Sequence, residues 1–249
     1  MEHESTQPSG FLLIDKPPGP TSHDVIDELR RRTGIRKIGH AGTLDPFASG
    51  LLLVAVGREA TREISRFVGL DKTYKATFIL GAHSTTLDPE GEIKAVPLPM
   101  DTRSRLENAL RTLTGKLQQT PPMYSAVKIG GKKLYELARE GKEVERKPRD
   151  VEVYSLALTS PLKSLDHGTP LSFEVCIHCS SGTYIRALAR DLGEMLGTAG
   201  YVHALQRTQI GPFHVRNAVP LEQISPQILS RFFLAVEDLG PLAKPSPRC

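Results

Sequence analysis

The chain has 249 residues, a formal net charge of +4 and 39% hydrophobic residues, values that are ordinary for a folded water-soluble protein. No apolar run reaches the length of a membrane span, and the first ten residues lack the apolar segment of a signal peptide. We therefore expect no membrane association and a cytoplasmic location.

Two apolar runs near the N-terminus predict buried strands, and a helix is predicted between them. The runs are residues 11–14, Phe-Leu-Leu-Ile, and residues 51–56, Leu-Leu-Leu-Val-Ala-Val. Thr21 and Asp24 have the spacing of a capping box, with Asp in place of the usual Glu or Gln, and Gly34 is a suitable helix end.

Residues 39–50, Gly-His-Ala-Gly-Thr-Leu-Asp-Pro-Phe-Ala-Ser-Gly, form a polar loop directly before the second apolar run. Pro46 restricts Asp45 to extended backbone geometry, while Gly42 and Gly50 permit turns that other residues resist. A carboxylate fixed in this way can serve as a nucleophile or a general base. Asp-Pro in a glycine-rich loop is also common turn chemistry, and composition by itself favours that simpler interpretation.

The middle of the chain continues with a short helix, a strand and a longer helix. The short helix is predicted over residues 59–68 and the strand over residues 71–80, where period-two alternation places Tyr74 on the inward face. An inward tyrosine is usually a core residue with a satisfied hydroxyl group. Residues 84–99 are predicted to be a loop, and Asp101 is predicted to cap the longer helix.

The second half of the chain adds further strands around one helix. Strands and helices are mixed without a βαβ rhythm, which predicts the α+β class, with a largely antiparallel mixed sheet flanked by helices. No composition break marks a second domain, so residues 1–249 are expected to form one domain. The predicted ranges are strands 151–158 and 171–179, helix 183–196, and closing strands 202–210 and 213–215.

Arg186 lies in the first turn of the helix predicted over residues 183–196. The helix dipole disfavours a cation at that end, so Arg186 needs a compensating anion. Asp191 and Asp45 are both candidates, and the residues alone do not decide between them.

Cys176 and Cys179 form a C-x-x-C pair inside the strand predicted over residues 171–179. Residues three apart in a strand face opposite sides of the sheet, and no second pair is present to complete a zinc site. We therefore expect no metal site.

Basic side chains gather in two segments. Residues 128–149, which include Lys128, Lys132 and Lys133, contain eight basic and four acidic residues, an excess equal to the net charge of the whole chain. A second cluster, residues 30–32, comes shortly before the polar loop. Such clusters near an active site suit phosphate contacts, although either one can also be the solvated face of a helix.

Six segments resemble, in the same order, the motifs of the tRNA pseudouridine-55 synthases, the pseudouridine synthase B family. The loop at residues 39–50 resembles the catalytic motif of that family, and the resemblance spans about residues 10–215. The other segments are Lys16-Pro17 with Gly19 and Thr21-Ser22, Lys72-Thr73-Tyr74, residues 122–128, residues 181–186, and residues 205–208 with Gly211-Pro212-Phe213.

This resemblance implies the pseudouridine synthase fold, with a basic helical insert that clasps RNA at about residues 122–149 and a short tail at about residues 220–249. It implies isomerisation of uridine to pseudouridine at position 55 in the T-loop of tRNA, without cofactor or metal. Many bacterial members add a small C-terminal RNA-binding domain, the PUA domain. Only about 35 residues follow Phe213, so we expect that domain to be absent. We also expect the protein to be a monomer.

The resemblance also implies a role for each site residue. Asp45 is the catalytic carboxylate, kept ionised by a pair with Arg186; attack on the sugar, addition to the base and proton abstraction all stay open for it. His40 fills the space that the flipped uridine leaves, and Tyr74 stacks on the flipped base. The remaining assignments are pocket walls for Tyr184 and Leu205, loop support for Lys16, and RNA-backbone contacts for Lys128, Lys132, Lys133, Arg30 and Arg31.

Two other functions stay compatible with the residues. A hydrolase that uses Asp45 as nucleophile on a nucleoside or sugar usually needs a second carboxylate nearby, and the motifs around Asp45, Tyr74 and Arg186 offer no obvious one. A non-catalytic RNA-binding or RNA-folding protein would not depend on Asp45. Free uracil would indicate the hydrolase, and unchanged RNA would indicate the binding protein.

Overall fold

The computed structural model describes residues 8–125, 127–164 and 170–234, which cluster into two compact units. Unit 1 combines the N-terminal part of the chain through Tyr74 with the part from Gln206 onward, and unit 2 is the uninterrupted segment Lys75–Leu205. The unit boundaries fall inside two strands, β4 (Lys72–Leu80) and β13 (Gly200–Ile210), so each of these strands contributes residues to both units.

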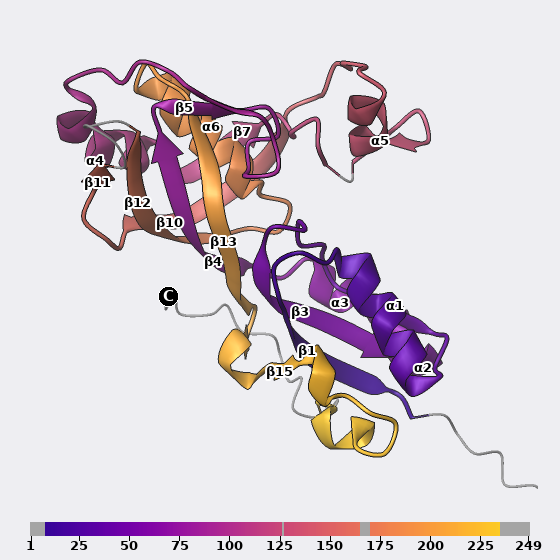
Figure 1. Ribbon diagram of the computed structural model, residues 1–249. Helices are drawn as coiled ribbons and strands as arrows, with labels where there is room; N and C mark the ends of the chain where they lie inside the picture. The colour runs from indigo at the N-terminus through magenta and orange to yellow at the C-terminus, as the bar shows by residue number, and fades with distance from the viewer. Residues whose placement is uncertain (1–7, 126, 165–169, 235–249) are drawn as a thin grey trace, which may run out of the picture. The chain divides into compact units, whose positions relative to one another are not determined.

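Unit 1 contains a sheet in the order β15-β1-β3-β13, with β2 beside β3 and β14 beside β13 (Figure 1). Strands β1 and β3 are antiparallel, whereas β3 and β13 are parallel. The elements are β1 (Gly10–Lys16), α1 (Ser22–Thr33), β2 (Ile38–His40), β3 (Ser49–Val56), α2 (Gly57–Arg62), α3 (Ser65–Val68), β14 (Phe213–His214) and β15 (Val219–Pro220), with 3-10 helices at Val215–Asn217, Leu221–Gln223 and Leu229–Phe232.

Alternation along β1 and β3 divides the core of unit 1 between the two faces of its sheet. Leu12, Ile14 and the even-numbered residues of β3 pack with the apolar side of α1. Phe11, Leu13 and the odd-numbered residues of β3 pack on the other face with Phe67 of α3. Both apolar runs of the sequence are therefore confirmed as strands that are covered on two sides, which explains why they lack polar residues.

Helix α1 begins and ends as predicted. The Thr21 hydroxyl accepts a hydrogen bond from the Asp24 amide at 3.1 Å, and the Asp24 carboxylate accepts one from the Thr21 amide at 2.8 Å. Gly34 follows the last turn in left-handed conformation, with φ of 73°. The capping box and the glycine end are confirmed, and they fix the direction in which α1 leaves the loop at residues 17–21.

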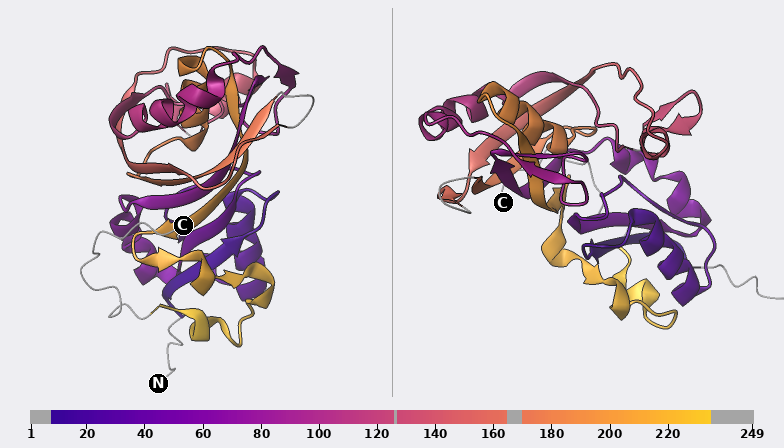
Figure 2. Two further views of the ribbon diagram at one scale, coloured as in Figure 1. Left: turned by 90° about the vertical axis from the view of Figure 1, so that its left-hand side faces the viewer. Right: turned by 45° about the horizontal axis from the view of Figure 1, so that its top comes forward.

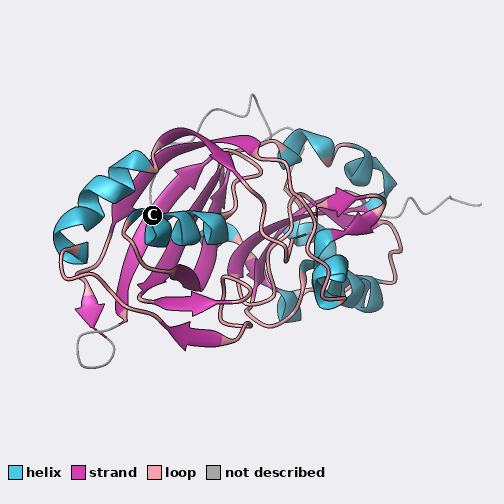
Figure 3. Ribbon diagram, turned by 90° about the horizontal axis from the view of Figure 1, so that it is seen from above, coloured by secondary structure: helices cyan, strands magenta, loops and turns pink. Residues whose placement is uncertain are grey.

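Unit 2 is built on strands in the order β13-β4-β12-β10-β7, with β11 beside β12. Helix α4 contacts both β10 and α6, and Figures 2 and 3 show α4 and α6 together on one side of these strands. Besides β4 and β13, the elements of unit 2 are β5 (Ala82–Ser84), β6 (Ile93–Ala95), α4 (Thr102–Thr112), β7 (Gly115–Gln119), β8 (Lys128–Ile129), β9 (Lys132–Lys133), α5 (Leu134–Arg139), β10 (Arg149–Leu158), β11 (Lys163–Ser164), β12 (Leu171–Cys179) and α6 (Ile185–Met195).

Most strand pairs are antiparallel, including β1–β3, β7–β10 and β10–β12, while β3–β13 and β1–β15 are parallel. The predicted α+β class with a mixed, largely antiparallel sheet is therefore confirmed. The basic segment contains a two-stranded hairpin, β8–β9, followed by α5, and in Figure 1 these lie away from α4 within unit 2. No helix in the described part of the chain has the length and hydropathy of a membrane span.

Three local predictions differ from the structure. The single helix at residues 59–68 is instead the pair α2 and α3, and the turn between them lets Phe67 pack against Phe11, with ring centroids 4.6 Å apart. Asp101 precedes α4 without a side-chain capping bond, because its carboxylate pairs with Arg105 at 3.3 Å. The predicted loop at residues 84–99 contains strand β6, which pairs with β5.

Candidate active site

The polar loop of the sequence connects β2 to β3 in unit 1, and Asp45 lies in its central turn. The Ala41 amide donates to the Leu53 carbonyl at 2.9 Å, which holds the start of the loop against β3. The Ala48 amide donates to the Asp45 carbonyl at 3.2 Å and closes a turn around Pro46. Gly42 and Gly50 have φ of 104° and 101°, so both take the left-handed backbone expected of them. Asp45 is half-buried.

Lys16, at the end of β1, lies beneath this turn and is completely buried. Its ammonium group donates to the carbonyls of Pro17, Pro20 and Pro46 at 2.8, 2.7 and 3.2 Å. The Pro46 carbonyl also accepts the Gly19 amide at 2.8 Å. One buried cation thus connects the proline-rich segment after β1 to the residue that follows Asp45.

Ser22, at the start of α1, fixes the residue on the other side of Asp45. Its hydroxyl accepts a hydrogen bond from the Leu44 amide at 2.9 Å and donates to the Leu44 carbonyl at 3.1 Å. Both groups are buried. Leu44 and Pro46, the two neighbours of Asp45, are therefore held by side chains from α1 and β1.

Arg207 of β13 is a third support, and sequence analysis assigned no role to it. Its side chain is fully buried and donates hydrogen bonds to three carbonyls of the loop and of β3. The Tyr74 hydroxyl and the Asp45 carboxylate both interact with its guanidinium, which opposes the lowering of the Arg207 pKa by burial. Asp45 and Tyr74, predicted from separate motifs, are therefore connected through Arg207.

His40 lies at the end of β2, immediately before the loop, and is half-buried. Its ring meets the ring of His23 edge-on, with centroids 6.0 Å apart and planes at 83°. Burial lowers the pKa of His40 below its usual value of 6.5, and the nearby charges of His23 and Arg207 lower it further, while the Gly42 backbone partly opposes this. A neutral imidazole suits contact with an uncharged base better than an imidazolium does.

In unit 2, Arg186 pairs with an aspartate that sequence analysis missed. Its guanidinium lies 2.8 Å from the Asp88 carboxylate, and the two side chains are 5% and 3% exposed. The same guanidinium donates to the carbonyls of Thr86 and Tyr124 at 2.9 and 2.5 Å. Asp191, one of the two anions expected to compensate Arg186, pairs instead with Arg190 at 2.6 Å.

Asp88 is held by a tight turn between β5 and β6. Its other carboxylate oxygen accepts hydrogen bonds from the Thr86 hydroxyl and from the Glu90 amide, the latter at 3.0 Å. Leu87 has φ of 63°, a conformation that costs a branched residue about 1–2 kcal/mol. The turn thus stores strain while it directs a fully bonded carboxylate toward Arg186.

Tyr184, the residue before α6, is positioned by the buried side chain of Gln119. The Gln119 amide oxygen accepts the Tyr184 amide proton at 2.9 Å, and its nitrogen donates to the Tyr184 carbonyl at 3.4 Å. Leu205 is a buried residue at the last position of unit 2 in β13. These contacts order the start of α6, the helix that carries Arg186 in its first turn.

The structure thus gathers the predicted site residues in two groups. Asp45, His40, Tyr74 and Lys16 belong to unit 1, and Arg186, Tyr184 and Leu205 belong to unit 2. The Asp45–Arg186 pair expected from the sequence joins one group to the other, and it stays a prediction.

The basic residues expected to contact RNA make several contacts within the protein. Arg30 pairs with Asp27 at 2.7 Å and also donates to the Arg36 and Ile38 carbonyls at 3.2 and 3.0 Å, so it helps to shape the segment before β2. Arg31 pairs with Glu28 at 2.6 Å and is 71% exposed. Lys132 lies 3.3 Å from Glu140 and is 58% exposed, and Lys128 and Lys133 belong to the same hairpin.

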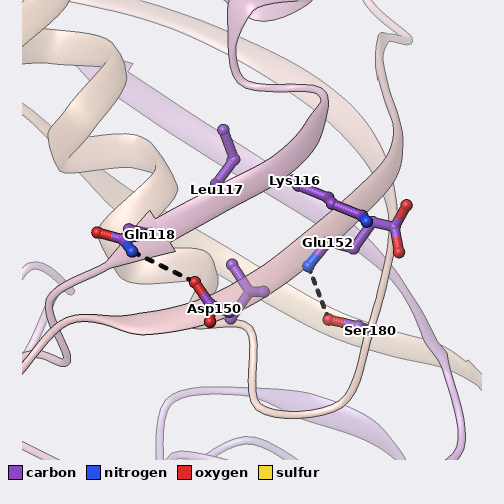
Figure 4. Close-up of a pocket in the computed structure, with 7 residues that line it drawn as sticks. Lys116, Leu117, Gln118, Asp150, Glu152 and Ser180 are labelled. Atoms are coloured by element: carbon purple, nitrogen blue, oxygen red, sulfur yellow. Dashed lines mark hydrogen bonds between the residues drawn. The ribbon is translucent and has the colours of Figure 1, made fainter.

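A separate hollow of about 550 Å³ lies at the β7–β10 edge of unit 2 and contains none of the predicted site residues (Figure 4). Its polar groups bond to one another: the Gln118 amide donates to Asp150 at 3.4 Å, and the Glu152 amide donates to Ser180 at 2.9 Å. Within the described ranges, no group of three or more His, Cys, Asp or Glu residues could hold a metal ion.

Two sequence profiles match consecutive parts of the chain. The profile described as "TruB family pseudouridylate synthase (N terminal domain)" matches residues 30–185, and the "tRNA pseudouridylate synthase B C-terminal domain" matches residues 186–238. Two curated relatives, both called tRNA pseudouridine synthase B, cover most of the chain. The one from Arthrobacter sp. is 43% identical, covering 88% of this chain and 72% of the relative. The one from Geobacillus thermodenitrificans is 46% identical, covering 86% and 71%.

Solved structures give a consistent result for the fold. A Cbf5-Nop10-Gar1 complex contains a chain that is 29% identical, with a TM-score of 0.63, over 89% of this chain and 55% of that one. A structure of an H/ACA RNP bound to a substrate RNA containing 2'-deoxyuridine has 25% identity and a TM-score of 0.61, over 86% and 51%. This chain spans about half the length of those two chains. From the matched profiles and the curated relatives together, we conclude that the chain belongs to the TruB family of pseudouridylate synthases.

Proposed function

We propose that this protein isomerises uridine to pseudouridine in tRNA, at position 55 of the T-loop, with Asp45 as the catalytic carboxylate. The observation that carries the assignment is the way Asp45 is held. Its two neighbours, Leu44 and Pro46, are bonded through their backbone to Ser22 and Lys16, while its own side chain stays half-buried. A carboxylate with a fixed backbone and an accessible side chain is suited to react with a ligand.

The reaction breaks the bond from C1′ of the ribose to N1 of uracil and forms a bond from C1′ to C5. N1 gains a proton and C5 loses one, so no electrons are transferred and no redox cofactor is required. Asp45 assists this exchange by attack on the sugar, by addition to the base, or by removal of a proton. All three roles require the carboxylate to be ionised, and its expected pairing with Arg186 would favour that form.

Base flipping brings the uridine to Asp45 at a cost of a few kcal/mol. His40 fills the vacated position in this proposal, because it directly precedes the loop and burial favours its neutral form by lowering its pKa. Tyr74 stacks on the flipped base, and Tyr184 and Leu205 form the walls of its pocket. Lys128, Lys132 and Lys133 contact phosphates of the RNA, with Arg30 and Arg31 as further contacts.

The relatives named tRNA pseudouridine synthase B, at 43% and 46% identity, support tRNA as the substrate. We propose that the protein acts as a monomer in the cytoplasm, where bacterial tRNA is processed. Residues 1–249 form one catalytic domain in this proposal, with the basic insert at about residues 122–149 as the main RNA contact.

The test is incubation of a tRNA transcript with wild-type protein, with Asp45→Asn and with Asp101→Asn as a matched control. Asp101 is an exposed aspartate at the start of α4. Wild type and Asp101→Asn should form pseudouridine at position 55, detected by mass spectrometry and carbodiimide mapping. Asp45→Asn should form none while binding tRNA within a few fold of wild type.

A transcript with cytidine at position 55 tests the choice of site, because it should yield no product. Turnover by Asp45→Asn would overturn the catalytic assignment, and pseudouridine at another position would overturn the T-loop assignment. Free uracil in the wild-type reaction would show a hydrolase, and unchanged RNA would show a protein that only binds.

A further inference from the structure

Arg207 passes directly beneath the Asp45 loop, because β13 pairs with β3 at the end of that loop. The register is parallel and places Arg207 opposite Gly50. A Cβ atom at Gly50 would overlap the backbone of Arg207, so the two strands approach this closely only with glycine at that position. Among the fully buried side chains of the described residues, Arg207 has the largest volume.

The guanidinium of Arg207 binds the loop at both of its ends. Nη2 and Nη1 donate to the carbonyls of Gly42 and Thr43 at 3.1 and 3.3 Å, before Asp45. Nε donates to the carbonyl of Leu51 at 2.8 Å, after it. Because the guanidinium is planar and rigid, three such bonds fix the separation of the two loop ends. Lysine cannot reproduce this arrangement, because its donors radiate from one atom.

The charge of Arg207 is also significant, since a buried cation needs nearby negative or polar groups to be stable. Carbonyl oxygens accept its hydrogen bonds but carry no net charge. The titratable groups that act on it are the Tyr74 hydroxyl from β4 and the Asp45 carboxylate from the loop, and His40 from β2 is affected by it. The attraction is mutual, so the buried cation favours the ionised form of Asp45.

We propose that Arg207 is a positioning residue of the reaction, which fixes the Asp45 loop at both ends and supplies a buried positive charge to Asp45 and Tyr74. This inference rests on the proposed function for its kinetic consequence but not for its electrostatic one. It differs from a purely structural role, because a structural residue changes how much protein is folded, whereas the charge of Arg207 also attracts the ionised carboxylate of Asp45.

The kinetic test compares wild type with Arg207→Lys, Arg207→Met and the control Arg105→Met. Arg105 is a half-exposed arginine that donates to the Met195 carbonyl at 3.0 Å and pairs with Asp101. Single-turnover rates on saturating tRNA should fall at least 100-fold in Arg207→Met, while the Kd for tRNA changes less than about 3-fold. The rate of Arg207→Lys should lie between those of wild type and Arg207→Met, and the rate of Arg105→Met should match that of wild type.

The pH profile of the same rate constant separates positioning from folding. In Arg207→Met, the acidic limb should move to higher pH, because the charge that favours ionised Asp45 is gone. In Arg207→Lys, which keeps the charge, the limb should stay close to that of wild type. A rate constant within threefold of wild type in Arg207→Met, or a loss of burst amplitude without movement of the limb, would overturn the inference.

A measurement without RNA makes the result independent of the proposed function. The carboxyl ¹³C resonance of Asp45, assigned by its loss in Asp45→Asn, should titrate at higher pH in Arg207→Met than in wild type. If wild type makes no pseudouridine but this shift is present, the proposed function fails and the role of Arg207 stands. If wild type is active and no shift occurs in a folded Arg207→Met protein, the role of Arg207 fails alone.

Discussion

Arg186 and Asp88 form a buried salt bridge at 2.8 Å, between residues 98 positions apart in the sequence. The second carboxylate oxygen of Asp88 accepts hydrogen bonds from Thr86 and Glu90. Both carboxylate oxygens therefore bond to residues of unit 2. The cation that the family resemblance assigns to Asp45 is therefore already positioned by another carboxylate. Arg186 can hold one geometry whether or not substrate is present.

Removal of the Asp88 carboxylate should destabilise unit 2. Asp88→Ala takes the paired carboxylate away from a buried guanidinium, and breaking a buried pair in this way costs about 3–5 kcal/mol. Urea denaturation followed by circular dichroism measures this loss. Glu92→Ala is the matched control in the same hairpin, because the Glu92–Lys94 pair is exposed and should contribute little. Equal stability of the two variants would contradict this account of Asp88.

Asp88 lies in a repeat of the motif that contains Asp45, because Thr-Leu-Asp-Pro occurs twice, at residues 43–46 and 86–89. The first copy attracts attention because it precedes a continuous apolar run. The second lies among turn-forming residues, where aspartate is common and carries no functional signal. Burial of the second carboxylate depends on Arg186, which no local pattern reveals.

Replacement of Lys16 by methionine should loosen the Asp45 turn without emptying the buried space that the Lys16 side chain fills. The ammonium group donates to three partly buried carbonyls, and a typical intramolecular hydrogen bond contributes about 0.5–1.5 kcal/mol to stability. We expect lower stability and faster amide hydrogen exchange at Ala48, whose amide closes the turn. Exchange at Val54, in the middle of β3, serves as the internal reference and should respond only to the global change.

Gly50→Ala should be much more harmful than Gly34→Ala, although both glycines have positive φ. A Cβ at Gly34 meets nothing within 4 Å, so only backbone strain of about 1–2 kcal/mol is expected. At Gly50 the Cβ overlaps the Arg207 backbone, which adds about 1–3 kcal/mol of overpacking. Thermal or urea unfolding of the two variants measures the difference, and equal losses would argue against the close β3–β13 contact.

The pKa of His40 predicts how stability depends on pH. Burial lowers this pKa below 6.5, so the folded protein binds the proton less readily than the unfolded chain does. The stabilisation is fully present above pH of about 6.5 and is lost as the pH falls toward the lowered value. His40→Gln should flatten this part of the curve of stability against pH.

The control for His40 is its neighbour His23, which is exposed and contributes a charge that lowers the pKa of His40. His23→Asn should raise the His40 pKa toward 6.5 without changing the fold. Titration of the imidazole resonances by NMR measures both groups. A His40 pKa that does not respond to His23→Asn would show that the two rings do not interact electrostatically.

The basic hairpin predicts a change in salt dependence. Lys132→Gln should weaken tRNA binding and reduce the slope of log affinity against log salt by about 1, as expected for one lost phosphate contact. Lys94→Gln is the matched control, since Lys94 is also exposed and paired with a glutamate, Glu92, at 3.0 Å. Glu140→Gln should strengthen binding, because it removes the anion that competes for Lys132. An unchanged slope in Lys132→Gln would remove this residue from the RNA contact.

The elements that were predicted well are those whose signals are local. The capping box at Thr21, the glycine end of α1 and the apolar run of β3 depend on neighbouring residues alone. Strand β7, Gly-Lys-Leu-Gln-Gln, has no β-branched residue and no strict alternation, and it forms because β10 pairs with it. No pattern in the sequence predicted strand β7.

The same dependence on local signals applies to the candidate site. Asp45, His40 and Lys16 lie in recognisable motifs, whereas the role of Arg207 depends on carbonyls that are 156 to 165 residues away. A strand pattern does not distinguish an arginine that is buried on such acceptors from one that faces water. The acceptors are backbone atoms, which any residue supplies, so their identity leaves no trace in the sequence.

The division of the chain at Tyr74 and Gln206 has a consequence for the order of synthesis on the ribosome. Unit 2 is one uninterrupted segment, so all of its residues have been made before β13 is complete. The Asp45 loop, by contrast, is made early and receives Arg207 only after that whole segment has emerged. A nascent chain that stops before Arg207 therefore carries Asp45 on a loop whose two ends are not yet held by the Arg207 guanidinium.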